Sequence, residues 1–163
     1  MVSNEEISVN KRNGRGKETL QIDKIHSMVG FATEGITGVS ASHVEMNSGI
    51  QFFDGVSTAD IQQILIKSAN DLISLENPNY QYVAARLLLF QLRKQLFHRL
   101  WDHPKFIDHI KTLIDKGLYD KDILANYDES EIDRMGMWID HERDYNFTYA
   151  GLRQVMDKYL VQD

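Results

Sequence analysis

Hydrophobic and polar positions define two short extended runs near the start of the chain and a helical pattern over most of the rest. The runs Ile7 to Asn10 and Glu18 to Ile22 flank a loop with an Asn-Gly step, which predicts a β-hairpin. Beyond the hairpin, apolar residues recur every three or four positions, the spacing of one face of an α-helix. Strands and helices do not alternate, so the pattern predicts a mainly α protein with one small β-hairpin as a cap.

Capping and helix-stopping residues divide the helical pattern into segments. The segment from about Tyr80 to about Phe97 is apolar on nearly all sides, which predicts a central, buried helix. The other expected boundaries are Asp23 as the cap of the first helix and Gly35 as its end, the capping-box pair Ser42 and Glu45, Thr58 before the third helix, Pro104 as a first helical residue, Gly117 as a stop, Asp128 with Glu131 as a helix start, and a last helix from about Tyr149 to about Leu160.

Composition narrows the classes of function. A length of 163 residues suits one domain, or one domain with a small additional segment. A net charge of −6 argues against a surface that binds nucleic-acid duplexes in general. The absence of cysteine excludes a disulfide scaffold, a zinc ribbon and thiol chemistry carried by this chain. The longest nearly unbroken apolar run, Val83 to Leu92, is too short for a membrane span.

The hairpin loop is the first candidate binding feature. Residues Lys11 to Lys17 hold four cations in seven positions and no acid, with two glycines that let the backbone approach a ligand. Such a loop can wrap a polyphosphate, or it can be a solvated hairpin tip, which composition alone favours. No Walker A or Gly-x-Gly-x-x-Gly pattern is present, so a nucleotide here requires a different fold.

Two further lysines could join that loop. Lys24 opens a helix directly after the second strand, where its charge adds to the positive helix terminus unless an anion lies there. Lys94 rises from an otherwise apolar helix below Phe90, where it could reach the same ligand or extend to solvent.

Other chemistry has little support in the sequence. The six histidines lack zinc-ligand spacing, and no serine stands in a Gly-x-Ser-x-Gly setting. The run Asp140 to Asp144 could be an acid–base or metal site, but such runs are more often salt-bridge networks. The residues alone therefore indicate a mainly helical domain with a cationic hairpin and do not name a function.

The order of several motifs resembles a known family. Val9-Asn10-Lys11-Arg12-Asn13-Gly14 followed by Ile22-Asp23-Lys24-Ile25 resembles the opening of an ATP-cone domain. The whole series resembles the N-terminal region of the large subunit of class I ribonucleoside-diphosphate reductase, over essentially the entire chain. The further motifs are Asp54-Gly55-Val56-Ser57-Thr58-Ala59-Asp60-Ile61, Pro78-Asn79-Tyr80-Gln81-Tyr82-Val83-Ala84-Ala85-Arg86-Leu87, His141-Glu142-Arg143-Asp144, Phe147-Thr148-Tyr149-Ala150-Gly151 and Lys158-Tyr159-Leu160.

The resemblance implies a helical bundle capped by a small sheet, residues 1–100, which binds ATP or dATP with Mg²⁺ as an allosteric effector. Residues 101–163 would be a short all-helical segment that leads into the reductase barrel. Catalytic and protein-held metal sites are not expected in this chain, nor is a tightly bound cofactor. The nucleotide-binding residues implied are Lys11, Arg12, Glu18, Thr19, Leu20, Gln21, Ile22, Asp23, Lys24, Thr58 and Lys94, with Val9, Ile25, Gln62 and Phe90 added to this set.

Three departures from the family pattern bear on inhibition by dATP more than on nucleotide binding. The loop between Gly14 and Glu18 is one residue longer, Gln62 stands where histidine is common, and Gln21 stands where asparagine is usual.

The barrel and its cysteines would lie beyond Asp163, so the chain is expected to be inactive alone and to act as a fragment or one piece of a split subunit. The expected partners are the rest of the large subunit and the radical-generating small subunit, in the cytoplasm, where the enzyme makes deoxyribonucleotides for DNA synthesis. Neither nucleic acid nor a membrane is expected as a partner. The alternatives are a stand-alone ATP-cone regulator, against which the absence of cysteine speaks, and a helical interaction module with a vestigial cone.

Overall fold

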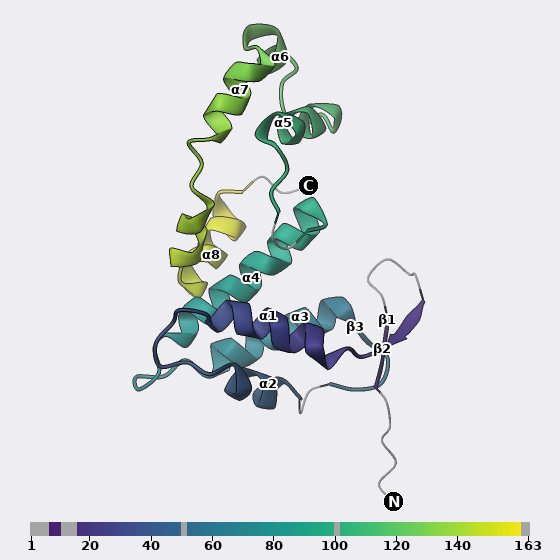
Figure 1. The fold of residues 1–163 in the computed structure, drawn as a ribbon, viewed down its shortest axis with the longest axis vertical. Coiled ribbons are helices and arrows are strands. Elements are labelled where there is room, and N and C mark those ends of the chain that lie inside the picture. Colours follow the sequence, from purple (N-terminus) through teal and green to yellow (C-terminus); the bar gives the residue numbers. More distant parts are fainter. Residues whose placement is uncertain (1–6, 11–15, 50–51, 100–101, 161–163) are drawn as a thin grey trace, which may run out of the picture. The chain divides into compact units, whose positions relative to one another are not determined.

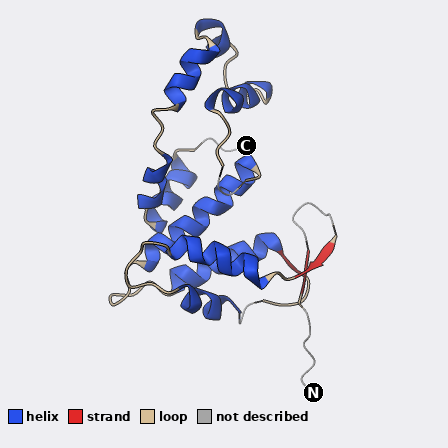
Figure 2. Cartoon of the chain, in the orientation of Figure 1, coloured by secondary structure: helices blue, strands red, loops and turns tan. Residues whose placement is uncertain are grey.

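The computed structural model describes residues 7–10, 16–49, 52–99 and 102–160. These segments are mainly helical with one small three-stranded sheet (Figures 1 and 2), which confirms the predicted fold class. No helix among them is both long and apolar enough to cross a membrane. The elements are β1 (Ser8–Asn10), β2 (Lys17–Thr19), α1 (Ile22–Thr33), α2 (Ala41–Gly49), β3 (Val56–Ser57), α3 (Thr58–Asp71), α4 (Tyr80–Phe97), α5 (Phe106–Asp115), α6 (Asp122–Asn126), α7 (Glu129–Gly136), the 3-10 helix η1 (His141–Asn146) and α8 (Tyr149–Lys158).

The chain forms two compact units. The first combines Met1–Gln91 with Tyr145–Asp163, and the second is Leu92–Asp144. Helix α4 therefore begins in the first unit and ends in the second. The division of function at residue 100 stays a prediction.

The sheet has the order β2-β1-β3. Strand β1 pairs antiparallel with β2, as the hairpin pattern predicts, and parallel with β3. Strand β3 is not predicted by the sequence pattern, because a strand of two residues is too short to show alternation. Its residue Val56 is fully buried beside Val9 of β1, so this strand joins the sheet to the core.

The helices of the first unit pack through apolar faces. Helix α1 buries Ile25, Val29 and Ala32, which lie on one face at helical spacing. Helix α1 contacts α2, and α2 contacts α3. Helix α4 has the bounds expected from the sequence, and the part of it in this unit is buried on nearly every side, as predicted.

Several predicted helix starts were wrong by one or two residues. Gln21 has an extended backbone and is the N-cap of α1, so Asp23 lies inside the first turn. Ser42 lies inside α2, which begins at Ala41. Helix α5 begins after the extended residue Lys105, two positions beyond Pro104. In contrast, the capping box of Asp128 and Glu131 and the stop at Gly117, whose φ is +73°, are as predicted.

The second unit has a small core between α5 and α7. Ile107, Ile110 and Ile132 are buried there, with Phe106, Ile114 and Ile123 against them. Gly136 ends α7 at a close approach of the two helices: a Cβ added to it would lie 2.6 Å from the Cβ of Phe106. Glycine is therefore required at this position by packing and not by its backbone angles.

The ends of the second unit are joined by a charged pair and an aromatic cluster. The buried guanidinium of Arg93 donates to Asp144 at 3.1 Å. The rings of His103 and His141 are stacked, with centroids 3.6 Å apart, and Phe97 meets His103 and His109 edge-on. These contacts hold residues from the start of the unit against residues from its end.

We expect Gly136→Ala to lower the free energy of unfolding by about 1–3 kcal/mol, because the added methyl group would overlap Phe106. Gly30→Ala is the matched control: it lies inside α1 with no atom within 4 Å of the added Cβ, so it should raise stability by about 0.8–1 kcal/mol. Urea unfolding followed by circular dichroism measures both. Equal effects of the two substitutions would contradict the packing argument.

Stability should fall on mild acidification. Burial lowers the pKa of His103 from its ordinary value of 6.5, and the neighbouring His141 and Arg93 lower it further, against the smaller effects of Asp144 and Asp102. The unfolded chain then binds the proton more readily than the folded one. The free energy of unfolding should therefore fall as the pH drops from 6.5 through the folded pKa.

His103→Phe keeps a stacking ring without a titrating group, so the loss of stability between about pH 7.5 and about pH 5.5 should be smaller in this variant. Burial lowers the pKa of His109 as well, so part of the pH dependence should remain. An unchanged pH dependence in His103→Phe would show that His103 does not contribute.

Candidate functional site

The sheet lies where two helices begin. Helix α1 starts three residues after β2 ends, and α3 starts directly after β3, so both N-termini border the sheet (Figure 1). Both helices present the positive end of the helix dipole at this edge. In the sequence, the cationic segment that starts at Lys11 connects β1 to β2.

The turn at Asp54 and Gly55, between α2 and α3, is hydrogen-bonded to β1. The backbone N–H and the hydroxyl of Ser8 both donate to the Oδ1 atom of Asp54, at 2.9 and 2.6 Å. The N–H of Gly55 donates to the carbonyl of Ser8, and the side-chain amide of Asn10 donates to the carbonyl of Gly55. Gly55 has a φ of +82°, which favours glycine at this turn. These bonds fix β3, and with it the start of α3, against β1.

The same bonds set the protonation of Asp54. The hydroxyl of Ser8 is the largest cause that lowers the pKa of this carboxyl, followed by the Ser8 N–H, with a smaller effect of Lys17. Asp54 therefore stays charged at neutral pH and continues to accept both bonds from Ser8.

The two helix starts differ in their capping. Ser57 caps α3: its hydroxyl accepts a bond from the N–H of Asp60, whose side chain accepts one from the N–H of Ser57. Gln21 makes no side-chain bond to the first turn of α1. The first turn of α1 is therefore the better place for an external anion, and it carries the exposed side chain of Lys24.

The nucleotide-binding residues implied by the resemblance differ in how far their side chains are exposed to solvent. Val9 pairs with Glu18 in the neighbouring strand, so these two side chains share one face of the sheet. Lys11 and Arg12 lie outside the described residues. Lys94 is exposed in the last turn of α4, within the second unit. Of the others, Thr19, Gln21, Ile22, Asp23 and Lys24 are exposed, Glu18, Leu20 and Thr58 are half-buried, and Val9, Ile25, Gln62 and Phe90 are buried.

Gln62 has a packing role in this structure. It is 4% exposed, and its amide nitrogen donates to the carbonyl of Leu87 at 2.9 Å. This bond connects α3 to α4 one turn along the helix from Thr58. One of the two amide N–H donors of Gln62 is therefore engaged by the protein itself.

The turn at Asp54 and Gly55 is not among the binding features predicted from the sequence, although Asp54 and Ser57 determine where α3 begins. Two sequence signals identify these residues. The Asp54-Gly55 pair is a turn signal, and Ser57 with Asp60 has the spacing of a cap.

The charged run near residue 140 is a network of ion pairs. Arg143 pairs with Asp140 at 3.4 Å, and Asp144 pairs with Arg93. Within the described ranges no group of three or more histidine, aspartate and glutamate side chains could hold a metal ion. The ion pairs themselves support the salt-bridge interpretation of the run.

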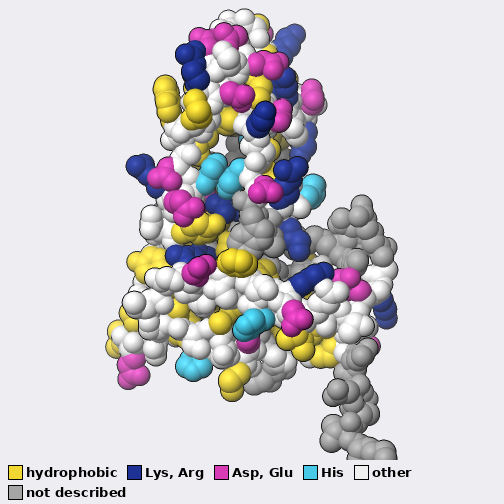
Figure 3. Space-filling model, in the orientation of Figure 1, with side chains coloured by type: hydrophobic (Ala, Val, Ile, Leu, Met, Phe, Trp, Pro, Cys, Tyr) yellow, Lys and Arg dark blue, Asp and Glu magenta, His cyan; other side chains and the backbone are white. Residues whose placement is uncertain are grey.

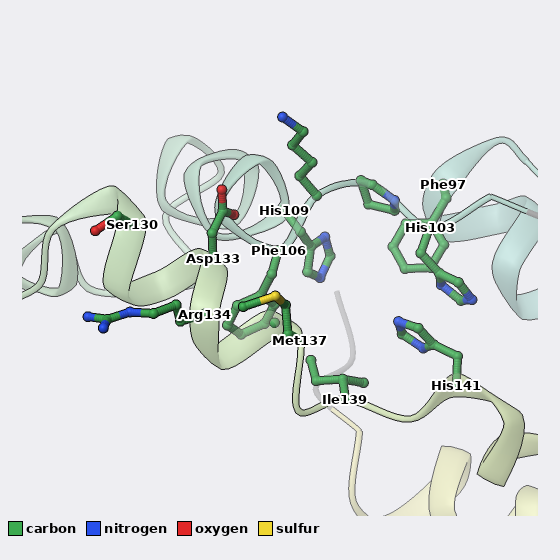
Figure 4. Close-up of a pocket in the computed structure, with 13 residues that line it drawn as sticks. Phe97, His103, Phe106, His109, Ser130, Asp133, Arg134, Met137, Ile139 and His141 are labelled. Carbon is green, nitrogen blue, oxygen red and sulfur yellow. The ribbon is translucent and has the colours of Figure 1, made fainter.

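The second unit contains a pocket of about 670 Å³. Imidazoles and phenyl rings gather at one end of it, where His141 points toward His103, and the guanidinium of Arg134 points away from them (Figure 4). Burial lowers the pKa of both His103 and His109, which favours the neutral form of these rings. The walls of this pocket are largely apolar, and none of the nucleotide-binding residues implied by the resemblance lines it.

Acidic and basic side chains are mixed over the visible face of the molecule (Figure 3). This mixture on the visible face agrees with the net charge of −6.

Nearly the whole chain is similar to the start of known reductase subunits. It is 44% identical over 160 residues to subunit alpha of ribonucleoside-diphosphate reductase 1 of Escherichia coli K12, covering 98% of this chain and 21% of that protein. It is 45% identical over 157 residues to the reductase subunit alpha of Buchnera aphidicola from Acyrthosiphon pisum, covering 96% of this chain and 20% of that protein. The subunit alpha of Enterobacteria phage T4 is 41% identical over 157 residues, with 96% and 20% covered.

The chain thus spans about a fifth of the length of the curated relatives it matches. Within it, residues 7–95 match the family model of the ATP cone domain. This match includes the sheet, α1 to α3 and most of α4. Because it covers more than half of the 163 residues, the chain belongs to the ATP-cone domain family.

Proposed function

We propose that the chain is the regulatory N-terminal part of a ribonucleoside-diphosphate reductase large subunit and that its cone binds ATP or dATP as an allosteric effector. The observation that carries the proposal is the junction of β2 and α1. There an uncapped helix start carries an exposed lysine, and the sequence before β2 is rich in cations. This combination favours the phosphates of a nucleotide.

The parts of the site have distinct roles in this proposal. Lys11, Arg12 and Lys24 contact the phosphates, together with Lys94. Thr58, at the start of α3, contacts the base and sugar. Ile22 is 70% exposed, and an apolar side chain so placed can cover one face of the nucleotide.

The remaining exposed and half-buried positions of the β2–α1 segment surround the nucleotide. Mg²⁺ would enter with the phosphates, since the described residues offer no metal-holding group of their own.

The partners follow from the relatives. The rest of the large subunit would supply the barrel and the reaction that makes deoxyribonucleotides, and the small subunit would supply the radical. The similarity extends well beyond residue 95, which supports a role of the following helices as the base on which the barrel docks. The complex would work in the cytoplasm.

We expect Lys11→Ala or Lys94→Ala to weaken ATP binding about ten- to a hundredfold, because each removes a charge-assisted phosphate contact worth about 1.5–3 kcal/mol. Isothermal titration calorimetry of the purified chain with Mg-ATP measures the affinity. Lys67→Ala is the control, since Lys67 pairs with Asp71 on α3 and is not among the proposed contacts. Unchanged affinity in both Lys11→Ala and Lys94→Ala would refute the site.

We further propose that this chain distinguishes ATP from dATP poorly. The two nucleotides differ by one 2′-hydroxyl, whose recognition needs a partner within hydrogen-bond distance. One N–H of the buried Gln62 amide is bonded to the carbonyl of Leu87, which fixes the orientation of this side chain toward α4. Two effectors that favour the same state equally cannot switch the enzyme.

An assembled reductase that contains this chain should therefore stay active at dATP concentrations that silence dATP-sensitive relatives. Activity titrations with dATP, beside a Gln62→His variant, measure this. Inhibition that appears only in the variant would support the proposal. Strong inhibition of the unmodified enzyme would refute it, and ATP binding by calorimetry confirms that the cone of either form is intact.

A further inference from the structure

A small polar pocket of about 240 Å³ lies in the first unit, apart from every residue of the proposed nucleotide site. Three segments line it: the turn after α1, the start of α4 and the end of η1. The eight described lining residues offer one guanidinium, two amides and three hydroxyl groups, and none of them carries a carboxylate. They are Gly35, Ile36, Thr37, Asn79, Tyr82, Arg86, Tyr145 and Asn146.

Arg86 is held in place from two sides. One terminal nitrogen, Nη1, donates to the carbonyl of Glu34 at 2.6 Å and lies 3.5 Å from the carbonyl of Ala32. The guanidinium carbon lies 5.4 Å from the ring centroid of Tyr145, in a cation–π contact. A planar donor group fixed in this way loses little conformational freedom when it binds a ligand.

The charge of Arg86 is only partly balanced. Within the described residues, no carboxylate forms an ion pair with it, and its buried Nε–H has no acceptor. The carbonyls at the end of α1 provide about half a negative charge at most. A half-buried guanidinium gains from a full negative charge at hydrogen-bonding distance.

We propose that this pocket binds an oxyanion, either a phosphate or a carboxylate group, through the free donors of Arg86 and the amide of Asn146. The surrounding hydroxyl groups and the second N–H of the Asn79 amide supply further donors, the first N–H of that amide being bonded to Thr37. A phosphate group and a carboxylate group each present two oxygen atoms that can accept hydrogen bonds from two N–H groups of one guanidinium. The opposing interpretation is that Arg86 serves only to cap the carbonyls of α1.

The test is an NMR titration of the whole chain with sodium phosphate and, separately, sodium acetate, at constant ionic strength set with sodium chloride. We expect saturable shifts of the backbone amides of Gly35 to Thr37 and Asn146 and of the Arg86 Nε–H. Saturation with phosphate alone assigns the site to phosphate groups. Saturation with acetate alone assigns it to carboxylates. Shifts that grow linearly without saturation for both probes would overturn the proposal.

Two variants separate binding from capping. Arg86→Lys should weaken the saturating anion roughly tenfold, because an ammonium cannot form the two-pronged contact. Asn146→Leu leaves the bonds of Arg86 to α1 intact and alters an exposed residue, so it should fold and still weaken binding. Unchanged affinity in Asn146→Leu and Arg86→Lys, both folded by circular dichroism, would contradict the proposal.

A third variant tests whether this pocket is separate from the proposed nucleotide site. Lys24→Ala should leave the shifts at Gly35 to Thr37 unchanged while it weakens ATP. If Lys24→Ala abolishes the phosphate shifts and Arg86→Lys does not, the anion binds at the nucleotide site and the present proposal fails.

Discussion

The central position of β1 in the sheet is the constraint on which the first unit depends. This strand of three residues pairs with β2 on one side and with β3 on the other. Its residue Ser8 also forms three hydrogen bonds with the turn at Asp54 and Gly55. Two segments far apart in the sequence therefore end at the same strand, and a helix starts from each. So short a sheet is not stable by itself. It persists because Val9 and Val56 are buried in the core.

The long helices could be predicted from the sequence, and the short connections could not. Helix α4 has the expected bounds because an apolar run of this length allows few alternatives. Strand β3 is different: its two residues join the sheet through bonds to a strand more than 45 positions earlier, and no local pattern encodes such a partner. The misplaced caps have a related cause. An acidic residue such as Asp23 is favourable both as an N-cap and in the first turn of a helix. Here Gln21 has the extended backbone of the N-cap, so Asp23 lies in the first turn.

The candidate site was predicted in part, and the reasons can be traced to particular residues. Lys24 could be identified because a cation at a helix start is unfavourable without an anion. The uncapped state of α1 could not be foreseen, since Gln21 is polar and could have bonded to the first turn. Gln62 shows the limit of a resemblance. A residue at a ligand-contacting position of a family can have its donor engaged by its own fold, and only the contact with Leu87 reveals this.

An acidic chain can still bind a polyanion, because the relevant charges are local. Charges further apart than about 8 Å are largely screened at physiological ionic strength, so the net charge of −6 acts weakly at any one site. At the β2–α1 junction, the exposed Lys24 lies in the first turn of a helix whose N-cap makes no side-chain bond, and the sequence between β1 and β2 adds four cations in seven residues. The same reasoning applies to Arg86, whose pocket has no acid among its described lining residues. At the Arg86 pocket the absence of a carboxylate among the described lining residues leaves positive charge for a ligand, whereas at the β2–α1 junction, where Asp23 lies in the first turn of α1, the positive charge comes from the number of cations.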